Sequence, residues 1–381
     1  MLSRFWSLIG QLLGRPRLHL EDGDDDFEPR HRPPSAPRRV DAPGEGETGS
    51  SPSPAPDSPG AGGQAADVPL PGGHPTPEAA LSADEDELEG ALRDHLHRCL
   101  AWLRSGDLPT RGGEDFLLAV EALSHPTKAL VPQLPQAARE AIAVSQDPDT
   151  ETKDLVALIH QDPALAQLLL RLANSALYAS PQPITHLTAA VTWVGRLGVS
   201  NAVLQHVISG QLCSPGRTFK GMPEALWGHL QQTAPLARQL APAFGAHPDQ
   251  VFTLALLHDV GKLVLFDHMA DLRRRLKREV RLTPEGIRLL LGATHEALGG
   301  IACLSWQLGA PMARSVVNHH RRVAPPRRDP VGETLYVADQ VEILRQRGED
   351  VDLDALWALG QLQASVPRVS ARLSATLDQA A

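Results

Sequence analysis

The sequence contains few of the residues from which secreted and nucleic-acid-binding proteins are built. Its 381 residues include only three cysteines, Cys99, Cys213 and Cys303, which are odd in number and far apart. They fit neither a disulfide framework nor a zinc-finger spacing, so we expect a reducing, cytoplasmic location. The net charge of −9 and a pI near 6.0 argue against a general nucleic-acid or membrane-surface binder.

Long apolar runs and alternating patterns are missing as well. No apolar run approaches the roughly 20 residues that span a bilayer, so we expect a soluble protein without a transmembrane segment. From residue 130 to residue 345 each segment has the periodicity of a helix, and none alternates as a strand does. Asp162-Pro163 predicts a helix start, with the Asp as N-cap and the Pro at the first helical position. Further helices are predicted over 184–194, 199–212, 284–291 and 296–307. The predicted fold class is therefore all-α, a compact multi-helix bundle with short loops.

Residues 1–14 are predicted to form a short amphipathic helix. Apolar side chains recur on one face at helical spacing, and these are Leu2, Phe5, Trp6, Ile9, Leu12 and Leu13. A membrane-surface helix needs basic residues on its polar face, and only Arg4 is available there. We therefore favour docking on protein over binding to lipid.

Residues 15–83 have the composition of a disordered linker. Fourteen of the chain's 33 prolines fall in this span, together with many Gly, Ser, Asp and Glu residues. Such a segment cannot bury enough apolar surface to offset the entropy lost on ordering. We predict a flexible tether between the first helix and the rest of the chain.

Three further regions follow the linker. Ser82 and Glu85 have the spacing of a capping box, and residues 84–124 are predicted to form a helical hairpin that packs on the main domain. Within it, His95 and His97 lie two residues apart and are expected on the surface. The main domain is predicted over 130–345, and a helical extension over 346–381.

The most informative stretch is a predicted helix from Gln250 to Asp267 that carries the adjacent pair His258-Asp259. An imidazole and a carboxylate between apolar residues are costly to bury unless another group compensates them. Imidazole and carboxylate together suit a divalent metal such as Mn, Fe, Mg or Zn. The alternative is a hydrogen-bonded pair in a helical core, and the dipeptide alone does not decide between the two.

Other histidines and aspartates on apolar helix faces extend this pair. The complete candidate ligand set is His229, His258, Asp259, His295, His319, His320 and Asp339. A single histidine on an apolar face is more often a satisfied core residue than a ligand. Seven such groups brought into one core would hold one metal ion, or two ions bridged by Asp259.

The order of these residues resembles the HD superfamily of metal-dependent phosphohydrolases, and within it the HDOD family, the HD-related output domain. Blocks upstream and around the histidines carry the resemblance: Val131–Pro135, Leu155–Leu158, Asp162–Leu165, Leu169–Ala176, Ile184–Gly195, Leu226–His229, Leu256–Lys262, His295–Gly299, Trp306 and His319-His320. The resemblance implies a helical bundle that acts in signal transduction, as an output or interaction module without established catalysis.

Two departures from the family pattern point in opposite directions. All HD ligand positions are present, which is more than an inactive scaffold requires. The Gly-Tyr-Pro loop of the cyclic-dinucleotide phosphodiesterases is absent, because Arg321 and Arg322 follow His320 directly. Whether the domain is an enzyme therefore stays open at this point.

The first function that we expect is a regulatory output module that binds a protein partner, or a nucleotide messenger, and retains one or two divalent metals. The alternative is a phosphohydrolase or phosphodiesterase acting on a nucleotide or cyclic nucleotide. In that case Lys262 and Asp259 would be catalytic, and Arg321 or Arg322 would contact phosphate. A first metal would then use His229, His258, Asp259 and Asp339, and a second metal His295, His319 and His320.

Overall fold

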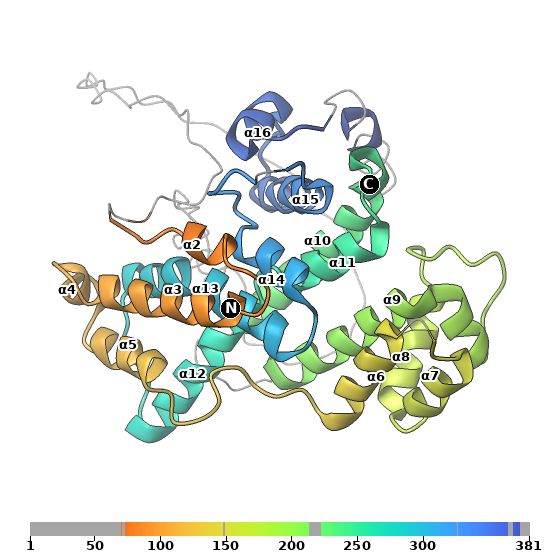
Figure 1. Ribbon diagram of the computed structural model, residues 1–381, viewed down its shortest axis with the longest axis horizontal. Coiled ribbons are helices and arrows are strands. Elements are labelled where there is room, and N and C mark those ends of the chain that lie inside the picture. The colour runs from red at the N-terminus through yellow and green to blue at the C-terminus, as the bar shows by residue number, and fades with distance from the viewer. Residues whose placement is uncertain are drawn as a thin grey trace, which may run out of the picture. The chain divides into compact units, whose positions relative to one another are not determined.

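The computed structural model confirms the all-α prediction for the part of the chain that it describes, in which helices are present and strands are not. The described residues are 70, 73–147, 149–212, 222–325, 327–364 and 369–373. The predicted helix at residues 1–14 lies outside them, and so does most of the predicted linker. All described residues belong to one compact unit (Figure 1).

The predicted C-terminal boundary of the linker, residue 83, was wrong, because residues 73–83 are part of the fold. They include the short helix α2, Glu78–Leu81, in which Ala80 is fully buried. Ser82 does not cap the next helix as we predicted. Its hydroxyl instead donates to the Glu78 carbonyl at 3.0 Å and ends α2, so the following helix begins six residues later.

The segment predicted as a helical hairpin contains three helices, which are α3 (Leu88–Leu103), α4 (Leu108–Gly112) and α5 (Phe116–Ser124). Helix α3 packs on α13 and α5 packs on α12 (Figure 1). The expectation that His95 is a surface residue was wrong, since its side chain is buried beneath α3, whereas His97 is exposed. The spacing that separates the two histidines places one on each face of the helix.

Asp115 joins this segment to the main domain. Its carboxylate is buried and accepts hydrogen bonds from Arg278 Nη1 at 2.6 Å and Nη2 at 2.8 Å. The main-chain N–H of Arg281 donates to the same carboxylate at 2.7 Å. The hydrogen bonds from Arg278 lower the pKa of Asp115 to about 2. The start of α5 is thereby fixed to the loop between α12 and α13.

Replacing Asp115 with alanine should lower the free energy of unfolding by about 2 kcal/mol, because charge-assisted hydrogen bonds are lost and a main-chain donor is left unpaired. The matched control is Glu114→Ala, which removes an exposed pair with Arg281 and should change little. Because folding depresses the pKa of Asp115, its contribution is complete above about pH 4 and disappears as the pH falls toward 2. Equal losses in urea melts of the two variants would contradict this assignment.

The first part of the main domain consists of helices α6 to α9 and a short π-helix. Their bounds are α6 Gln136–Gln146, α7 Thr152–Ile159, α8 Pro163–Ala173, α9 Leu187–Val207 and η1 Ile208–Leu212. The predicted start of α8 is confirmed, since Asp162 accepts from the N–H groups of Ala164 and Leu165. The two helices predicted around Gly195 form one element that is interrupted there, where φ is +71° and glycine is favoured.

The sequence Ala-Asn-Ser-Ala, residues 173–176, has a structural role in this region. The Asn174 side-chain amide donates to the carbonyls of Leu170 and Ile184, both at 2.8 Å, and its oxygen accepts from the Ile184 N–H at 2.7 Å. One side chain therefore closes the loop between α8 and α9.

The remaining helices carry the candidate site. They are α10 (Met222–Phe244), α11 (Pro248–Leu257), α12 (Val260–Leu276), α13 (Pro284–Ser305), α14 (Ala310–Val317), α15 (Pro330–Arg347) and α16 (Leu353–Gly360). Helix α13 is continuous where we predicted two helices, 284–291 and 296–307. Of the predicted C-terminal extension, α16 and a helical turn at 369–373 lie within the described residues.

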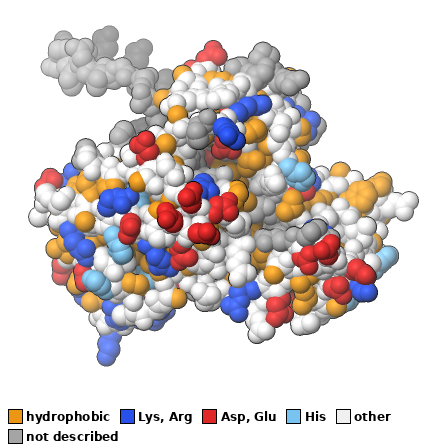
Figure 2. Space-filling view, viewed as in Figure 1, with side chains coloured by type: hydrophobic (Ala, Val, Ile, Leu, Met, Phe, Trp, Pro, Cys, Tyr) orange, Lys and Arg blue, Asp and Glu red, His pale blue; other side chains and the backbone are white. Residues whose placement is uncertain are grey.

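Two helical segments, Leu187–Gly210 and Pro284–Ser305, have the length and apolar composition of a membrane span. This finding departs from our expectation that no apolar run reaches that length. Both segments are mostly buried inside the structure, as core helices of a globular domain are. On the face shown in Figure 2, acidic and basic side chains are intermixed.

Candidate metal centre

The His258-Asp259 pair lies at a break between two helices. We predicted one helix from Gln250 to Asp267, but α11 ends at Leu257 and α12 begins at Val260. Asp259 departs from helical geometry, with φ −105° and ψ 10°. Because the chain turns here, both side chains face the interior. In a straight helix, two successive side chains would point in different directions.

Gly261 allows α12 to approach α13 closely. A Cβ atom built on Gly261 would lie 1.9 Å from the carbonyl oxygen of His295 and 2.7 Å from the Gly299 nitrogen. No side chain fits in that space, so glycine is required at this crossing. At this crossing the start of α12 lies next to His295.

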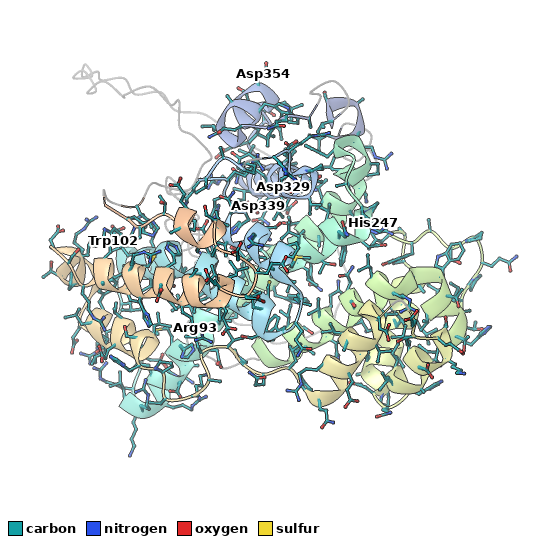
Figure 3. All side chains as sticks on the ribbon, viewed as in Figure 1. Arg93, Trp102, His247, Asp329, Asp339 and Asp354 are labelled. Atoms are coloured by element: carbon teal, nitrogen blue, oxygen red, sulfur yellow. The ribbon has the colours of Figure 1, made fainter. Side chains whose placement is uncertain are left out.

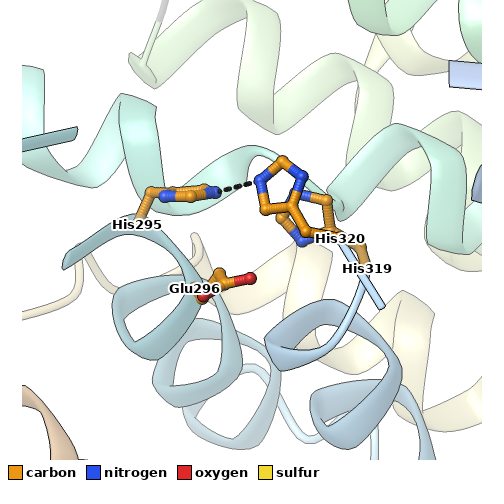
Figure 4. Close-up of side chains that lie close together, drawn as sticks. All are labelled: His295, Glu296, His319 and His320. Atoms are coloured by element: carbon orange, nitrogen blue, oxygen red, sulfur yellow. Dashed lines mark hydrogen bonds between the residues drawn. The ribbon is translucent and has the colours of Figure 1, made fainter. Parts of the chain in front are cut away.

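Helix α13 and the turn after α14 supply a second group of side chains (Figure 4). His295 and Glu296 come from α13, while His319 and His320 follow the end of α14. His295 Nε2 lies 3.0 Å from His320 Nε2. One ligand atom from each of these four residues lies within 4.8 Å of the others, which is compatible with a single ion.

Helices α10 and α15 complete the site with His229 and Asp339, the latter labelled on α15 in Figure 3. Asp339 Oδ1 lies 2.9 Å from His229 Nε2 and 3.5 Å from His258 Nε2. These three residues form another group whose ligand atoms lie within 4.8 Å of one another. Side chains more than 100 positions apart in the sequence are thus neighbours.

Asp259 lies between the two groups. Its Oδ2 is 3.6 Å from His258 Nε2, and its Oδ1 is 3.8 Å from His295 Nε2 and 3.6 Å from His319 Nε2. The ammonium of Lys262, one turn further along α12, donates to Oδ2 at 2.6 Å. Asp259 thus has imidazoles of both groups within 4 Å, and its role as a bridge between two metals stays a prediction.

Three of the histidines are oriented by the main chain. The Nδ1 atoms of His258, His295 and His319 contact the carbonyl oxygens of Ala255, Leu291 and Val316 at 2.7 to 2.8 Å. A contact of this kind fixes the proton on Nδ1 and leaves the Nε2 lone pair available for a ligand. All three Nε2 atoms lie within 4 Å of Asp259.

The centre of the site is nearly closed to solvent. His258, Asp259, His295, His319 and Asp339 expose between 1% and 6% of their surface. Asp259 Oδ1 and His319 Nε2 are buried without a hydrogen-bond partner, although they lie 3.6 Å apart. A buried acceptor pair without donors is costly. A divalent cation fits this pair and the surrounding imidazole and carboxylate donors.

Burial and neighbouring charges shift the pKa values of the site. Burial alone would lower the pKa of His258, but Asp259 and Asp339 outweigh burial and raise that pKa. Burial opposes ionisation of both carboxyls, but Lys262 and three histidines hold the pKa of Asp259 well below its usual range. Hydrogen bonds from His229 and His258 do the same for the pKa of Asp339. Burial, with a contribution from His320, lowers the pKa of His319 far below its ordinary value. The site therefore presents carboxylates and a neutral imidazole, which are the ligand forms that metals need.

The seven predicted ligand residues all meet in this region. Of the two predicted phosphate contacts, Arg321 is engaged elsewhere, whereas Arg322 contacts the edge of the cluster. Arg321 is buried, and its guanidinium donates to the main-chain carbonyls of Gly360 and Gln361, which disfavours a role in phosphate binding. Arg322 contacts Glu296 at 3.3 Å. Glu296 was missed by the sequence reasoning, although its position next to His295 was a usable signal.

Comparison with known proteins agrees with this geometry. The sequence matches the HDOD domain family over residues 131–322, about half of the chain, so the chain belongs to the HDOD family. An uncharacterized protein of Treponema pallidum is 28% identical over 219 residues, which cover 55% of this chain and 41% of that protein. The chain thus spans about two fifths of the length of this curated relative.

Solved structures share the fold at low sequence identity. An HDOD domain protein of unknown function from Geobacter sulfurreducens is 22% identical, with a TM-score of 0.52 over 72% of this chain and 96% of that one. A protein from Shewanella amazonensis, provisionally described as a metal-dependent phosphohydrolase, is 18% identical, with a TM-score of 0.50 over 74% and 99%. A protein from Marinobacter aquaeolei, provisionally described as a signal transduction protein, is 20% identical, with a TM-score of 0.51 over 78% and 65%.

Proposed function

We propose that this chain is a cytoplasmic regulatory output domain whose helical core holds one or two divalent metal ions and which acts by binding a partner protein. The observation that carries the metal assignment is the buried pair Asp259 Oδ1 and His319 Nε2, which lack hydrogen-bond partners at the centre of oriented imidazoles. A cation there would compensate the carboxylates and link five helical segments. Its binding energy would therefore also stabilise the fold.

The donor set narrows the kind of metal. Imidazole nitrogens outnumber carboxylate oxygens in the cluster, and no sulfur belongs to any of its three ligand groups. Imidazole suits Fe and Zn, and the carboxylates among the donors also admit Mn, whereas Mg prefers oxygen ligands and retains several waters. We therefore favour Mn, Fe or Zn over Mg for this centre.

The burial of the ligands favours a regulatory role over turnover. A substrate phosphate must reach the metals, but the five central side chains are almost inaccessible. The edge of the cluster includes partly exposed side chains, namely His229, at 13%, Lys262, at 20%, Arg322, at 26%, and His320. A protein partner needs no such access, because it binds the outer helix surfaces.

The alternative, a metal-dependent phosphohydrolase, is supported by Lys262. Its ammonium lies 2.6 Å from Asp259 and is partly exposed, so it would neutralise a phosphate oxygen arriving at this edge. Bound metal would supply Lewis acidity and a water nucleophile at neutral pH. His229, Lys262 and Arg322 would then orient the substrate.

Turnover assays distinguish the two functions. The full chain loaded with Mn²⁺ is incubated with cyclic dinucleotides and with bis(4-nitrophenyl) phosphate. We expect rates no higher than those of Asp259→Asn, because the closed cluster excludes these substrates. Hydrolysis that is at least tenfold faster in the unmodified chain than in Asp259→Asn, and that is retained in Asp267→Asn, would establish the phosphohydrolase instead.

A further inference from the structure

Helix α16 lies outside the residues that match the HDOD family, yet it is bound by the turn that carries two ligands of the histidine–aspartate centre, which is the cluster of candidate metal ligands. Arg321 directly follows His319 and His320 in the sequence. Its guanidinium donates from Nε to the carbonyl of Gly360 and from Nη2 to that of Gln361. Both carbonyls lie at the C-terminal end of α16, where main-chain acceptors lack helical partners and a cation is favoured.

The turn from Asn318 to Val323 is closed by its own hydrogen bonds, so a displacement of Arg321 would also move the two ligands. The main-chain N–H of Arg321 donates to the Asn318 carbonyl at 2.8 Å. The side chain of Asn318 donates to the carbonyl of Val323 at 2.8 Å and accepts from its N–H at 3.1 Å. His319 and His320 lie within this closed turn. The ligands and the guanidinium that binds α16 therefore belong to one small structural unit.

Glu333 of α15 binds the chain just after α16. Its carboxylate is fully buried and accepts from the N–H groups of Gln363 at 3.2 Å and Ala364 at 3.1 Å. Arg321 is buried as well, with 4% of its surface exposed. Among the described residues, neither Arg321 nor Glu333 forms an ion pair with another side chain, and their compensating groups are main-chain groups of the C-terminal segment. Two buried charges thus hold this one segment in place.

Helix α16 also packs on α10 and α15, which supply further ligands to the histidine–aspartate centre; Figure 1 shows α16 next to α15. The Trp357 ring stacks on Phe244 at the end of α10, with ring centroids 6.0 Å apart. A Cβ atom built on Gly360 would lie 2.5 Å from Cε1 of Tyr336 on α15. Helix α16 therefore contacts three of the elements that carry candidate ligands, and its position depends on theirs.

We propose that Arg321 couples the histidine–aspartate centre to α16, so that metal binding and the docking of residues 353–364 stabilise each other. The inference rests on the metal centre proposed above and adds a regulatory element to it. When His319 and His320 hold an ion, their turn is restrained and keeps the guanidinium at the end of α16. Coupling between two sites is reciprocal. A partner protein that detaches α16 would therefore weaken metal binding, and loss of the metal would loosen α16.

Hydrogen–deuterium exchange of the full chain, with and without saturating Mn²⁺, tests this coupling. We expect Mn²⁺ to slow exchange in residues 353–364 at least about fivefold, the lower end of coupling between two sites, and to lose this effect in Arg321→Ala. The affinity for Mn²⁺, measured by isothermal titration, should fall by a similar factor in Arg321→Ala. It should recover in part in Arg321→Lys, which keeps a charged donor at this position but not the planar guanidinium.

A second variant displaces α16 and leaves Arg321 unchanged. The side chain of Gly360→Val would collide with Tyr336 and push the end of α16 away from the turn. The affinity for Mn²⁺ should fall as much as in Arg321→Ala. Because both variants break the same connection, the double variant should bind Mn²⁺ no more weakly than either single variant. Losses of affinity that add in the double variant would contradict the coupling.

Arg328→Ala is the matched control. Arg328 also donates to a carbonyl at the end of a helix, that of Phe244 in α10 at 2.8 Å, but it does not adjoin a ligand. This variant should keep both the affinity for Mn²⁺ and the exchange response. If Arg321→Ala behaves like Arg328→Ala in a chain that binds Mn²⁺, the coupling is overturned and the metal centre stands. If the unmodified chain binds no Mn²⁺, the metal centre and the coupling are both overturned.

Discussion

Replacing Gly261 with alanine should lower the free energy of unfolding by about 3 kcal/mol and abolish metal binding at the histidine–aspartate centre. The added methyl group would lie 1.9 Å from the His295 carbonyl oxygen, and main-chain atoms on both sides prevent a rotamer change from relieving the clash. Helices α12 and α13 must therefore separate. That movement carries Asp259 away from His295 and His319, whose Nε2 atoms lie within 4 Å of it.

Gly90→Ala is the matched control for this substitution. Gly90 is an exposed residue of α3, and an added Cβ meets nothing within 4 Å. Because alanine is the better helix former, this variant should be more stable by about 0.5 to 1 kcal/mol and should bind metal normally. Thermal melts and Mn²⁺ titration of both variants measure the difference. If Gly261→Ala melted and bound Mn²⁺ like the unmodified chain, the close crossing would not position the site.

Asp259→Ala should weaken metal binding by at least about 100-fold, since even the supporting residues of a metal site are worth 10- to 100-fold. Asp259 lies within 4 Å of His258, His295 and His319 and so joins both groups. Asp339 belongs to the group of His229 and His258, and Glu296 to that of His295, His319 and His320. The metal-free variant should also lose about 3 kcal/mol of stability, because Lys262 keeps a partly buried charge without its partner. Isothermal titration with Mn²⁺ and chemical unfolding in chelator measure the two effects separately.

Asp267→Asn provides the control, because Asp267 is also a buried carboxylate of α12 paired with a lysine, Lys128. It lies outside the histidine cluster, so its loss should reduce stability and leave the affinity for Mn²⁺ unchanged. Chelator should lower the melting temperature of Asp267→Asn and of the unmodified chain, but hardly that of Asp259→Ala. Similar losses of affinity in both variants would mean that Asp259 acts through stability alone.

The meeting of the seven candidate ligands in one region was predictable, because chemistry and family resemblance agree in the sequence. Histidines and aspartates on apolar helix faces require compensation wherever they are buried, so the set His229, His258, Asp259, His295, His319, His320 and Asp339 was identifiable without coordinates. Local signals with a defined geometry, such as Asp162-Pro163 at the start of α8, were also reliable.

Features set by tertiary contacts were not predictable. The break at His258-Asp259 lies inside an uninterrupted apolar pattern, and only the approach of α13 to Gly261 reveals why the chain turns there. The burial of His95 depends on α3 packing against α13. Arg321 follows the histidine pair directly, but a positive φ of 53° turns its side chain toward Gly360.

Metal analysis of the purified full chain tests the central claim most directly. The account predicts at least one equivalent of Mn, Fe or Zn per chain, which falls to background in Asp259→Ala. A folded chain that contains no such metal, and whose melting temperature responds neither to chelator nor to added Mn²⁺, would show that the cluster is a hydrogen-bonded core and not a metal centre.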